Sequence, residues 1–206
     1  MLGCGSEPSR IADIRFAAID FESAGAERGA TDVPVQIGVA VTGEDGHIDL
    51  SRSFVSFLSS DRPILWSARK VHGITDDDIA GAPTFYDVWP EVRERLRGRW
   101  IVAHGAGTER RFLKAFPGHG FGPWIDTLQL YRQVMPDSAS HSLSYLCREA
   151  GIEDYCLNLL PGFRWHDALS DAIASLALLQ HWIQSAGMAN DPPARLASVN
   201  SNRRNF

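Results

Sequence analysis

Short apolar segments first follow one another and then alternate with helical segments, and this order limits the folds open to the chain more than any other feature. Strands are expected at 15–20, 35–42 and 53–58, with turn-rich sequence rather than helix between them. Two later strands, at 100–103 and 124–125, are separated by a helical segment. Strands in hairpins, followed by strands that alternate with helices, are typical of a mixed sheet. The sequence therefore predicts an α/β fold with a mixed β-sheet of about five strands flanked by helices.

Capping residues mark where helices begin. Thr84 precedes apolar side chains at four-residue spacing, which predicts a helix to about Arg97. Thr75, with Asp78 three residues later, resembles a capping box and predicts a short helix. Four more helices are expected, at 108–115, 127–134, 143–150 and 168–184.

Length and composition fit one soluble domain, since the 206 residues are 44% hydrophobic and 22% charged. We expect this domain to span 15–186, with flexible ends at 1–14 and 187–206. No apolar run approaches the ~20 residues of a membrane span, and the first residues lack the apolar region of a signal peptide. A cytoplasmic location without membrane contact is therefore expected. Three widely spaced cysteines predict free thiols rather than a zinc site.

The formal net charge of −5 argues against a strong nonspecific binder of duplex nucleic acid, which would carry a basic surface. It remains compatible with an enzyme that acts on nucleic acid. Carboxylates that hold divalent metals count as negative in this sum, and the bound ions reverse their local effect.

The first chemical feature is Asp20-Phe21-Glu22, at the end of the first expected strand. Side chains two residues apart on a strand point to the same face, so two carboxylates would lie together. Such a pair repels unless a proton or cation lies between them, and Mg²⁺ or Mn²⁺ prefers these oxygen ligands. A solvated acidic turn is the alternative, because Asp-x-Glu is common by chance.

The second feature runs from a buried strand through a glycine-rich turn to a helix start, at 101–109. Glu109 would lie in the first helical turn, where the helix dipole favours a negative charge. A surface glutamate with that role alone is the alternative. His104 directly follows the strand, where histidine is more often hydrogen-bonded within the protein than a ligand.

The third feature is His166 followed by Asp167 and Asp171 at the start of a long apolar helix. Histidine is the usual general base near neutral pH, and His166 would lie on the loop before the helix. The alternative makes Asp167 the N-cap, Asp171 a partner of the helix dipole and His166 a surface residue.

In their order, these features resemble the DEDDh family of 3′→5′ exonucleases, which includes the proofreading subunit of bacterial DNA polymerase III, ribonuclease T and oligoribonuclease. The resemblance covers about Phe16 to Gln184 and includes the stretch VHGIT at 71–75, for which the sequence shows no local structural need. It implies a ribonuclease H-like fold. The middle motif departs from the family pattern His-Asn-Ala-x-Phe-Asp, since here Glu109 replaces the aspartate and Gly105 the amide.

The resemblance implies a two-metal mechanism. Asp20 would bridge two Mg²⁺ or Mn²⁺ ions, Glu22 and Asp171 would complete the first site, and Glu109 would serve the second. His166 would deprotonate the attacking water, while the ions stabilise the incoming hydroxide and the leaving 3′ oxygen. Asp126 is the next candidate if Glu109 has no metal role.

The substrate implied is the 3′ end of single-stranded DNA or RNA, released as 5′-mononucleotides. We expect Phe21, Ser23 and His104 to contact the terminal nucleotide, and Trp165 either to stack on a base or to anchor the start of the last helix. Family analogy offers a DNA polymerase subunit and a second copy of the chain as partners. Two alternatives stay open, a binding module of the same fold that has lost turnover and an oligoribonuclease-like enzyme that acts on short RNA.

Overall fold

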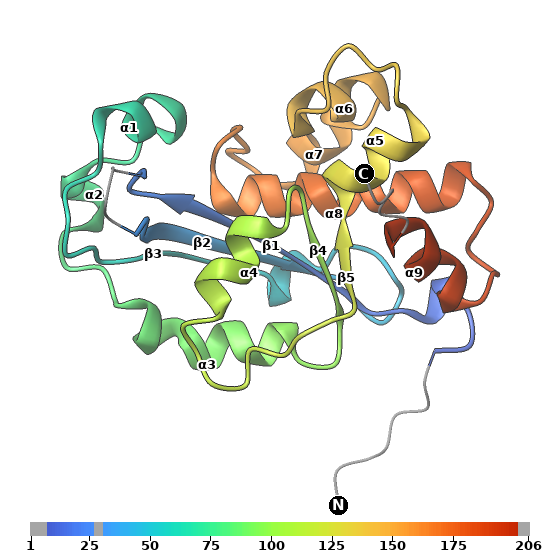
Figure 1. Cartoon of the computed structure of the whole chain (residues 1–206), viewed down its shortest axis with the longest axis horizontal. Helices are drawn as coiled ribbons and strands as arrows, with labels where there is room; N and C mark the ends of the chain where they lie inside the picture. Colours follow the sequence, from blue (N-terminus) through green and yellow to red (C-terminus); the bar gives the residue numbers. More distant parts are fainter. Residues whose placement is uncertain (1–7, 27–30, 202–206) are drawn as a thin grey trace, which may run out of the picture.

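A five-stranded mixed β-sheet forms the centre of the structure, a computed structural model that describes residues 8–26 and 31–201 (Figure 1). The strands lie in the order β3-β2-β1-β4-β5. Their bounds are β1 (Phe16–Ser23), β2 (Pro34–Val41), β3 (Phe54–Phe57), β4 (Trp100–Ala103) and β5 (Trp124–Asp126). The first three strands pair antiparallel as a meander, whereas β4 lies parallel to β1 and β5 parallel to β4. The predicted α/β fold with a mixed sheet of five strands is confirmed.

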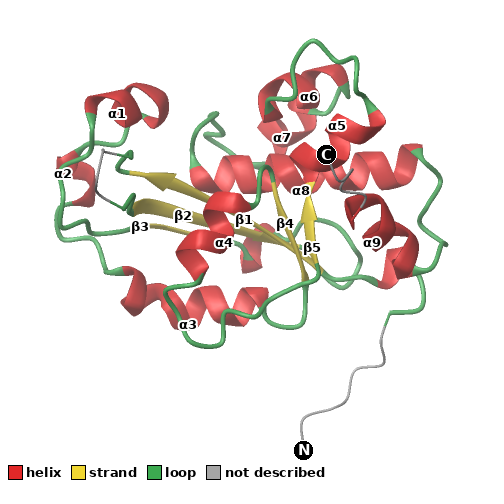
Figure 2. Ribbon diagram, viewed as in Figure 1, coloured by secondary structure: helices red, strands yellow, loops and turns green. Residues whose placement is uncertain are grey.

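Helices cover both faces of this sheet (Figure 2). One face packs against α3 (Phe85–Leu96) and α4 (Gly107–Leu113), whose buried side chains join the core formed by Ile19 and Ile37. The other face packs against α8 (Ala168–Ser185), the helix that makes the most extensive contacts with β1 and β2. Beyond α8 lie α5 (Thr127–Val134), α6 (Leu143–Glu149) and α7 (Glu153–Leu159). Two short helices, α1 (Trp66–His72) and α2 (Asp76–Ile79), lie beyond the end of β1 (Figure 1).

The start of α8 lies directly on β2, and a glycine makes this approach possible. A Cβ atom at Gly38 would lie 2.2 Å from the carbonyl carbon of Ala168, far inside any normal contact. Gly38 also pairs with Asp20 of β1 in the sheet register. The same close contact therefore brings the first turn of α8 next to the acidic end of β1.

Parts of both segments that the sequence predicts to be flexible pack against the domain. The segment expected to be a flexible tail from 187 instead contains α9 (Pro193–Ser201), and Met188 and Leu196 are buried. At the other end, Ile11 lies in a short 3₁₀ helix (Ile11–Asp13), is buried, and donates its N–H to the carbonyl of Asp191. The apolar residues responsible are isolated in polar sequence, so they carry no periodic signal. The expected flexible residues 1–7 and 202–206 lie outside the described residues.

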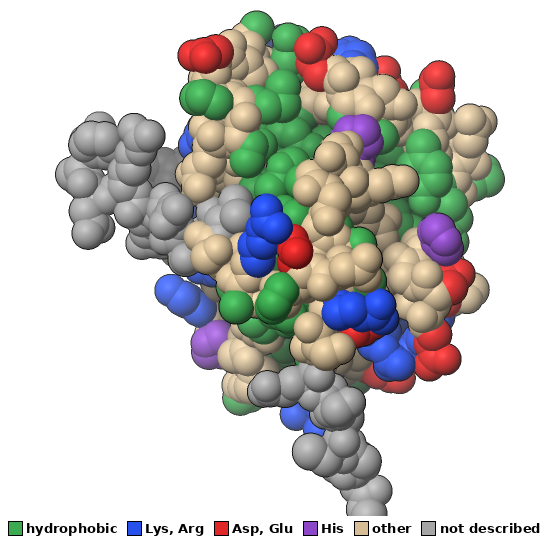
Figure 3. Space-filling view, turned by 90° about the vertical axis from the view of Figure 1, so that its right-hand side faces the viewer, with side chains coloured by type: hydrophobic (Ala, Val, Ile, Leu, Met, Phe, Trp, Pro, Cys, Tyr) green, Lys and Arg blue, Asp and Glu red, His purple; other side chains and the backbone are tan. Residues whose placement is uncertain are grey.

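The side on which α8 ends and α9 packs is partly apolar. Figure 3 views this side and shows hydrophobic side chains gathered in its upper part. A groove of about 300 Å³ between α5, α6 and α8 is lined by Val134, Met135, Leu146 and Trp182, among others. Among the described helices, none combines the length and the apolar character needed to cross a membrane. Cys147 and Cys156 are buried free thiols, as predicted, and Cys4 lies outside the described residues.

Substitution of Gly38 by alanine should lower the stability of the protein, because the new methyl group would overlap the backbone of Ala168. The expected loss is of the size that overpacking of a core causes, about 1–3 kcal/mol. Thermal unfolding of Gly38→Ala measures it. Gly120→Ala is the matched control, because an added Cβ there meets nothing within 4 Å. Equal melting temperatures for the two variants would show that α8 and β2 can separate freely.

Candidate active site

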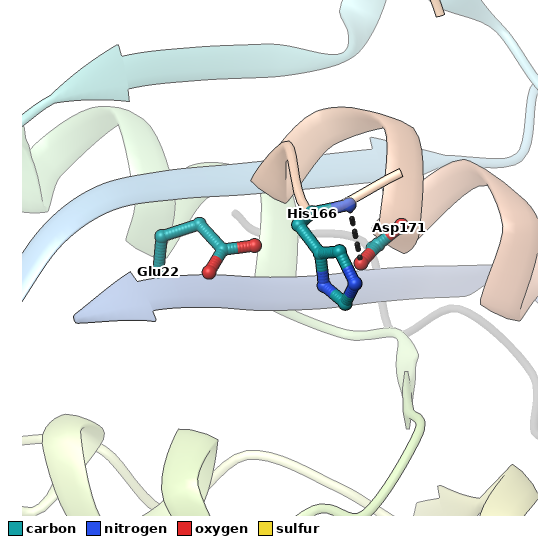
Figure 4. A group of neighbouring side chains, drawn as sticks. All are labelled: Glu22, His166 and Asp171. Atoms are coloured by element: carbon teal, nitrogen blue, oxygen red, sulfur yellow. Dashed lines mark hydrogen bonds between the residues drawn. The ribbon is translucent and has the colours of Figure 1, made fainter. Parts of the chain in front are cut away.

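Three side chains from two distant parts of the sequence meet near the end of β1 (Figure 4). Glu22 comes from β1, His166 from the loop before α8, and Asp171 from the first turns of α8. Each offers one ligand atom, and these atoms all lie within 4.8 Å of one another. This spacing and donor set are compatible with a bound divalent cation.

The alternation of side chains along β1 decides which ones reach this cluster. Ile19 and Phe21 pack toward α3 and α4, so Asp20 and Glu22 point to the face that α8 covers. Burial raises the pKa of Asp20 well above its ordinary value. The further causes are neighbouring negative charges, in decreasing order those of Glu109, Asp171, Glu22 and Asp167. The carboxylates of β1, α4 and α8 thus lie within electrostatic reach of one another.

The pKa values of Glu22, Glu109 and Asp171 are raised as well. Burial is the main cause of a pKa of about 8 for Glu22, and the charge of Asp171 adds to it. Burial likewise raises the pKa of Glu109 to about 7 and that of Asp171 to about 7. Like charges that are crowded and desolvated favour protons, and a divalent cation in their midst would favour the ionised form instead.

Two carboxylate oxygens in the cluster are buried without a hydrogen-bond partner, Oε2 of Glu109 and Oδ1 of Asp171. An unsatisfied buried oxygen is costly, and native proteins normally satisfy such groups. Carboxylate oxygens are also the ligands that Mg²⁺ and Mn²⁺ prefer. The residues present therefore fit a hard divalent cation, and the buried carboxylate of Glu109 has an oxygen free to face one.

His166 is exposed and holds an unusual backbone conformation. Its φ angle is +61°, in the left-handed region that non-glycine residues seldom adopt. Its backbone N–H donates to Oδ2 of Asp171 at 3.3 Å. Backbone strain of this kind persists where the surrounding structure enforces it, commonly at functional sites. The neighbouring Trp165 donates its indole N–H to Glu153 at 3.2 Å and packs edge-on against Phe163, so it anchors the loop.

The sequence model of an exonuclease family (RNase_T) matches residues 17–179, which include all of these side chains. The chain belongs to this exonuclease family. Exodeoxyribonuclease 10 of Escherichia coli strain K12 is 31% identical over 170 residues, covering 82% of this chain and 69% of the relative. A DNA polymerase III subunit epsilon-like protein of Rhodobacter capsulatus is 30% identical over 184 residues, covering 85% of this chain but only 25% of that protein.

Solved structures agree with this assignment. Exonuclease X in complex with 5′ overhanging duplex DNA is 28% identical, with a TM-score of 0.69, and the match covers 88% of this chain and 98% of that one. The nuclease domain of 3′hExo, a DEDDh family member bound to rAMP, has a TM-score of 0.68 over 86% of this chain and 95% of its own. At 16% identity, the second likeness concerns the fold alone.

The three residues expected to contact the terminal nucleotide, Phe21, Ser23 and His104, all have partners within the protein. The Phe21 side chain is buried edge-on against Phe85 and Phe112, so only its main chain reaches the site. The carbonyl of Ser23 accepts a hydrogen bond from a histidine of α1. His104 uses both ring nitrogens within the protein, at 3.0 Å to Thr127 Oγ1 and 2.9 Å to the carbonyl of His141. A contact of His104 with nucleotide would thus involve only its ring face.

Asp126, the reserve candidate for the second metal, is occupied elsewhere. Its carboxylate accepts from the N–H groups of Gly105 and Ala106, both at 3.0 Å, and from Gln129 at 3.1 Å. It thereby caps α5 and holds the turn that carries Glu109. Gly105 has a φ angle of +89°, which a glycine adopts at little cost, and this explains its presence in the altered middle motif.

The sequence analysis missed the structural role of His72, within the stretch at 71–75, and missed Gln36 altogether. His72 accepts the N–H of Ile74 at Nδ1 and donates from Nε2 to the carbonyl of Ser23 at 3.1 Å, which gives the stretch at 71–75 its structural purpose. Gln36 of β2 is buried and bonds to the start of α8. A single polar residue within the apolar pattern VQIGVAV was the only available signal for Gln36.

Without a divalent metal, the protein should lose stability as the pH rises. The raised pKa values, about 8 for Glu22 and about 7 for Glu109 and Asp171, mean that the folded state favours their protonated forms. That stabilisation is complete below about pH 4, the unfolded pKa, and is lost as the pH rises through 7 and 8. In EDTA, the melting temperature should therefore fall between about pH 6 and pH 9, and Mn²⁺ should raise it more at the upper end.

Asp171→Asn is the control for this experiment, since it removes one of the titrating groups and should flatten the pH dependence. A melting temperature that does not change with pH in EDTA, or a Mn²⁺ effect of equal size at both ends, would contradict the proposed crowding of carboxylates.

Proposed function

We propose that the protein is a 3′→5′ exonuclease that uses two Mg²⁺ or Mn²⁺ ions to hydrolyse the terminal phosphodiester bond of single-stranded nucleic acid. The observation that carries the proposal is the convergence of buried carboxylates from β1, α4 and α8, two of them with unpartnered oxygens, beside an exposed histidine. Membership of the exonuclease family supports the reaction class. The direction of cleavage comes from the resemblance to DEDDh enzymes.

The proposed roles come from the resemblance to the DEDDh family, and the convergence of the side chains supports them. Asp20, Glu22 and Asp171 would hold one ion, and Glu109 together with Asp20 would hold the second. Bound there, the ions supply neutralising charge for the phosphate. His166 takes a proton from the attacking water at a ring nitrogen, and the water oxygen forms the new bond to phosphorus. The bond to the 3′ oxygen breaks, which releases a 5′-mononucleotide and shortens the strand by one residue.

Glu109 is proposed as a working replacement for the family aspartate. It is buried, its pKa is raised to about 7, and its charge acts on Asp20. Glutamate is one methylene longer than aspartate, and the turn that carries it contains Gly105 at positive φ. In the proposal, the Glu109 carboxylate can therefore still reach the ion beside Asp20. These observations weigh against the binding-module alternative, which would need no carboxylate in that place.

The proposals for substrate and partners rest on the relatives of the chain. DNA is favoured because the relative from Escherichia coli is named an exodeoxyribonuclease. The epsilon-like and PolC-type relatives are much longer than this chain, which covers 25% of the first and 13% of a PolC-type DNA polymerase III from Bacillus cereus. A polymerase partner is therefore a proposal by analogy, as is a homodimer.

Purified protein with Mn²⁺ should shorten 5′-labelled single-stranded DNA one nucleotide at a time, and EDTA should abolish this activity. A 3′-labelled strand should release labelled mononucleotide at once, which gives the direction. Parallel reactions with RNA and with dinucleotides distinguish the oligoribonuclease-like alternative. Binding of the DNA without cleavage would favour the binding module, and full activity in chelator would exclude the proposed mechanism.

Replacement of His166 by alanine should lower the cleavage rate about 10²- to 10⁴-fold, the range for a positioned general base. Mn²⁺ binding, measured by calorimetry, should change little. His166→Gly is a matched control, because glycine adopts the left-handed backbone of this position without strain. Both variants should lose activity alike. Loss of metal binding in step with activity would instead make the histidine a ligand.

A further inference from the structure

The side-chain amide of Gln36 connects β2 to the start of α8. Its Oε1 accepts the backbone N–H of Ala168 at 3.0 Å, and its Nε2 donates to Oδ2 of Asp167 at 2.9 Å. The residue is only 2% exposed, and it lies opposite Glu22 in the register of β1 and β2. One buried amide thus satisfies an orphan N–H at the start of the helix and the residue that caps it.

Asp167 completes a small network around the loop that carries His166. Its Oδ1 accepts from the backbone N–H and the hydroxyl of Ser170, both at 3.2 Å. The Ser170 hydroxyl also accepts the backbone N–H of Arg164 at 3.3 Å, and the Arg164 guanidinium lies 3.7 Å from Asp167. Trp165 and His166 lie between Arg164 and Asp167, so the network holds the loop on both sides of His166.

The chemistry at position 36 requires an amide. Ala168 needs an acceptor and the Asp167 carboxylate needs a donor, and glutamine supplies both from a single planar group. A carboxylate at this position would oppose Asp167, whereas an apolar side chain would leave two buried groups unsatisfied. Two residues from Gln36 along β2, Gly38 lets the backbone of α8 approach the sheet.

We propose that Gln36 is a positioning residue for the hydrolysis, which acts through Asp167 and Ala168 to hold His166 and Asp171 against Glu22. The inference rests on the proposed function, in which His166 moves the proton and Asp171 binds a metal. Without the amide bridge, Gly38 still lets α8 approach β2, but the start of the helix and the loop before it lose the connection that fixes the positions of Asp171 and the His166 side chain.

The test uses three variants of the full chain, assayed with Mn²⁺ on 5′-labelled single-stranded DNA. Gln36→Met removes both hydrogen bonds at similar volume and should lower kcat about 10- to 100-fold with KM within about threefold, because small misplacements are costly in catalysis. Gln36→Glu should also be impaired, because its carboxylate faces that of Asp167.

The double variant Gln36→Glu with Asp167→Asn reverses the polarity of the pair. The amide introduced at position 167 can donate to the new carboxylate and still cap Ser170, so this variant should recover kcat to within a few-fold of the parent. A stabilising role alone would not produce this rescue. Thr84→Ala is the control for loss of a helix cap elsewhere, since Thr84 caps α3. It should lower the melting temperature and leave kcat unchanged.

The outcomes separate the two proposals. An inactive parent protein overturns the proposed function itself. An active parent with unchanged kcat in Gln36→Met, or with a double variant no better than Gln36→Glu, overturns only the role of Gln36. If Gln36→Met loses activity only in proportion to its unfolded fraction, measured by circular dichroism, the residue serves stability and the inference is also overturned.

Discussion

The contact between the first turn of α8 and the middle of β2 is the constraint on which the site depends. It requires a residue without a side chain at Gly38, and it is completed by the amide of Gln36 two residues earlier. Because β2 pairs with β1 in a register that sets Gly38 opposite Asp20, the position of α8 on one strand decides its distance from the carboxylates of the next. The close contact of α8 with β2 at Gly38 thus determines both the packing of the helix and the position of its acidic residue.

That arrangement concentrates negative charge in a buried place, against the ordinary preference of carboxylates for water. Hydrophobic packing around β1 holds the charges together, since Ile19 and Phe21 alternate with Asp20 and Glu22 and commit the strand to the core. The raised pKa values and the two unpartnered oxygens are the electrostatic signs of this conflict. Crowded and desolvated carboxylates repel one another, and a bound cation would relieve this repulsion, so the same crowding favours cation binding.

Much of the fold and the type of site could be predicted from the sequence. Apolar periodicity and capping residues located most elements, and the bounds of β4 and α5 agree with those expected. The helices α1, α7 and α9 escaped prediction because they are short or bury few side chains, Cys156 alone in the case of α7. Their stability comes from tertiary contacts, which local patterns do not reveal.

Within the site, residue types with distinctive chemistry could be predicted, and residues that act on backbone groups could not. The order of Asp20, Glu22 and Asp171 predicts a metal site through the resemblance to the DEDDh family. By contrast, Asp126 binds the N–H groups of a turn 20 residues earlier, and Gln36 bonds to a helix 132 residues later. These partners are defined only by the folded chain, so a pattern of letters cannot show them.

The packing of residues 11–12 against residues 189–191 has a consequence for the architecture. The N–H groups of Ile11 and Ala12 bond to the carbonyls of Asp191 and Ala189, on the side of the sheet away from the point of β1 (Figure 1). The segment before β1 and the segment after α8 are therefore neighbours at this side of the sheet. These backbone bonds fasten residues that precede the first strand to residues that follow the last helix of the sheet layers, so the two segments can only detach from the sheet together.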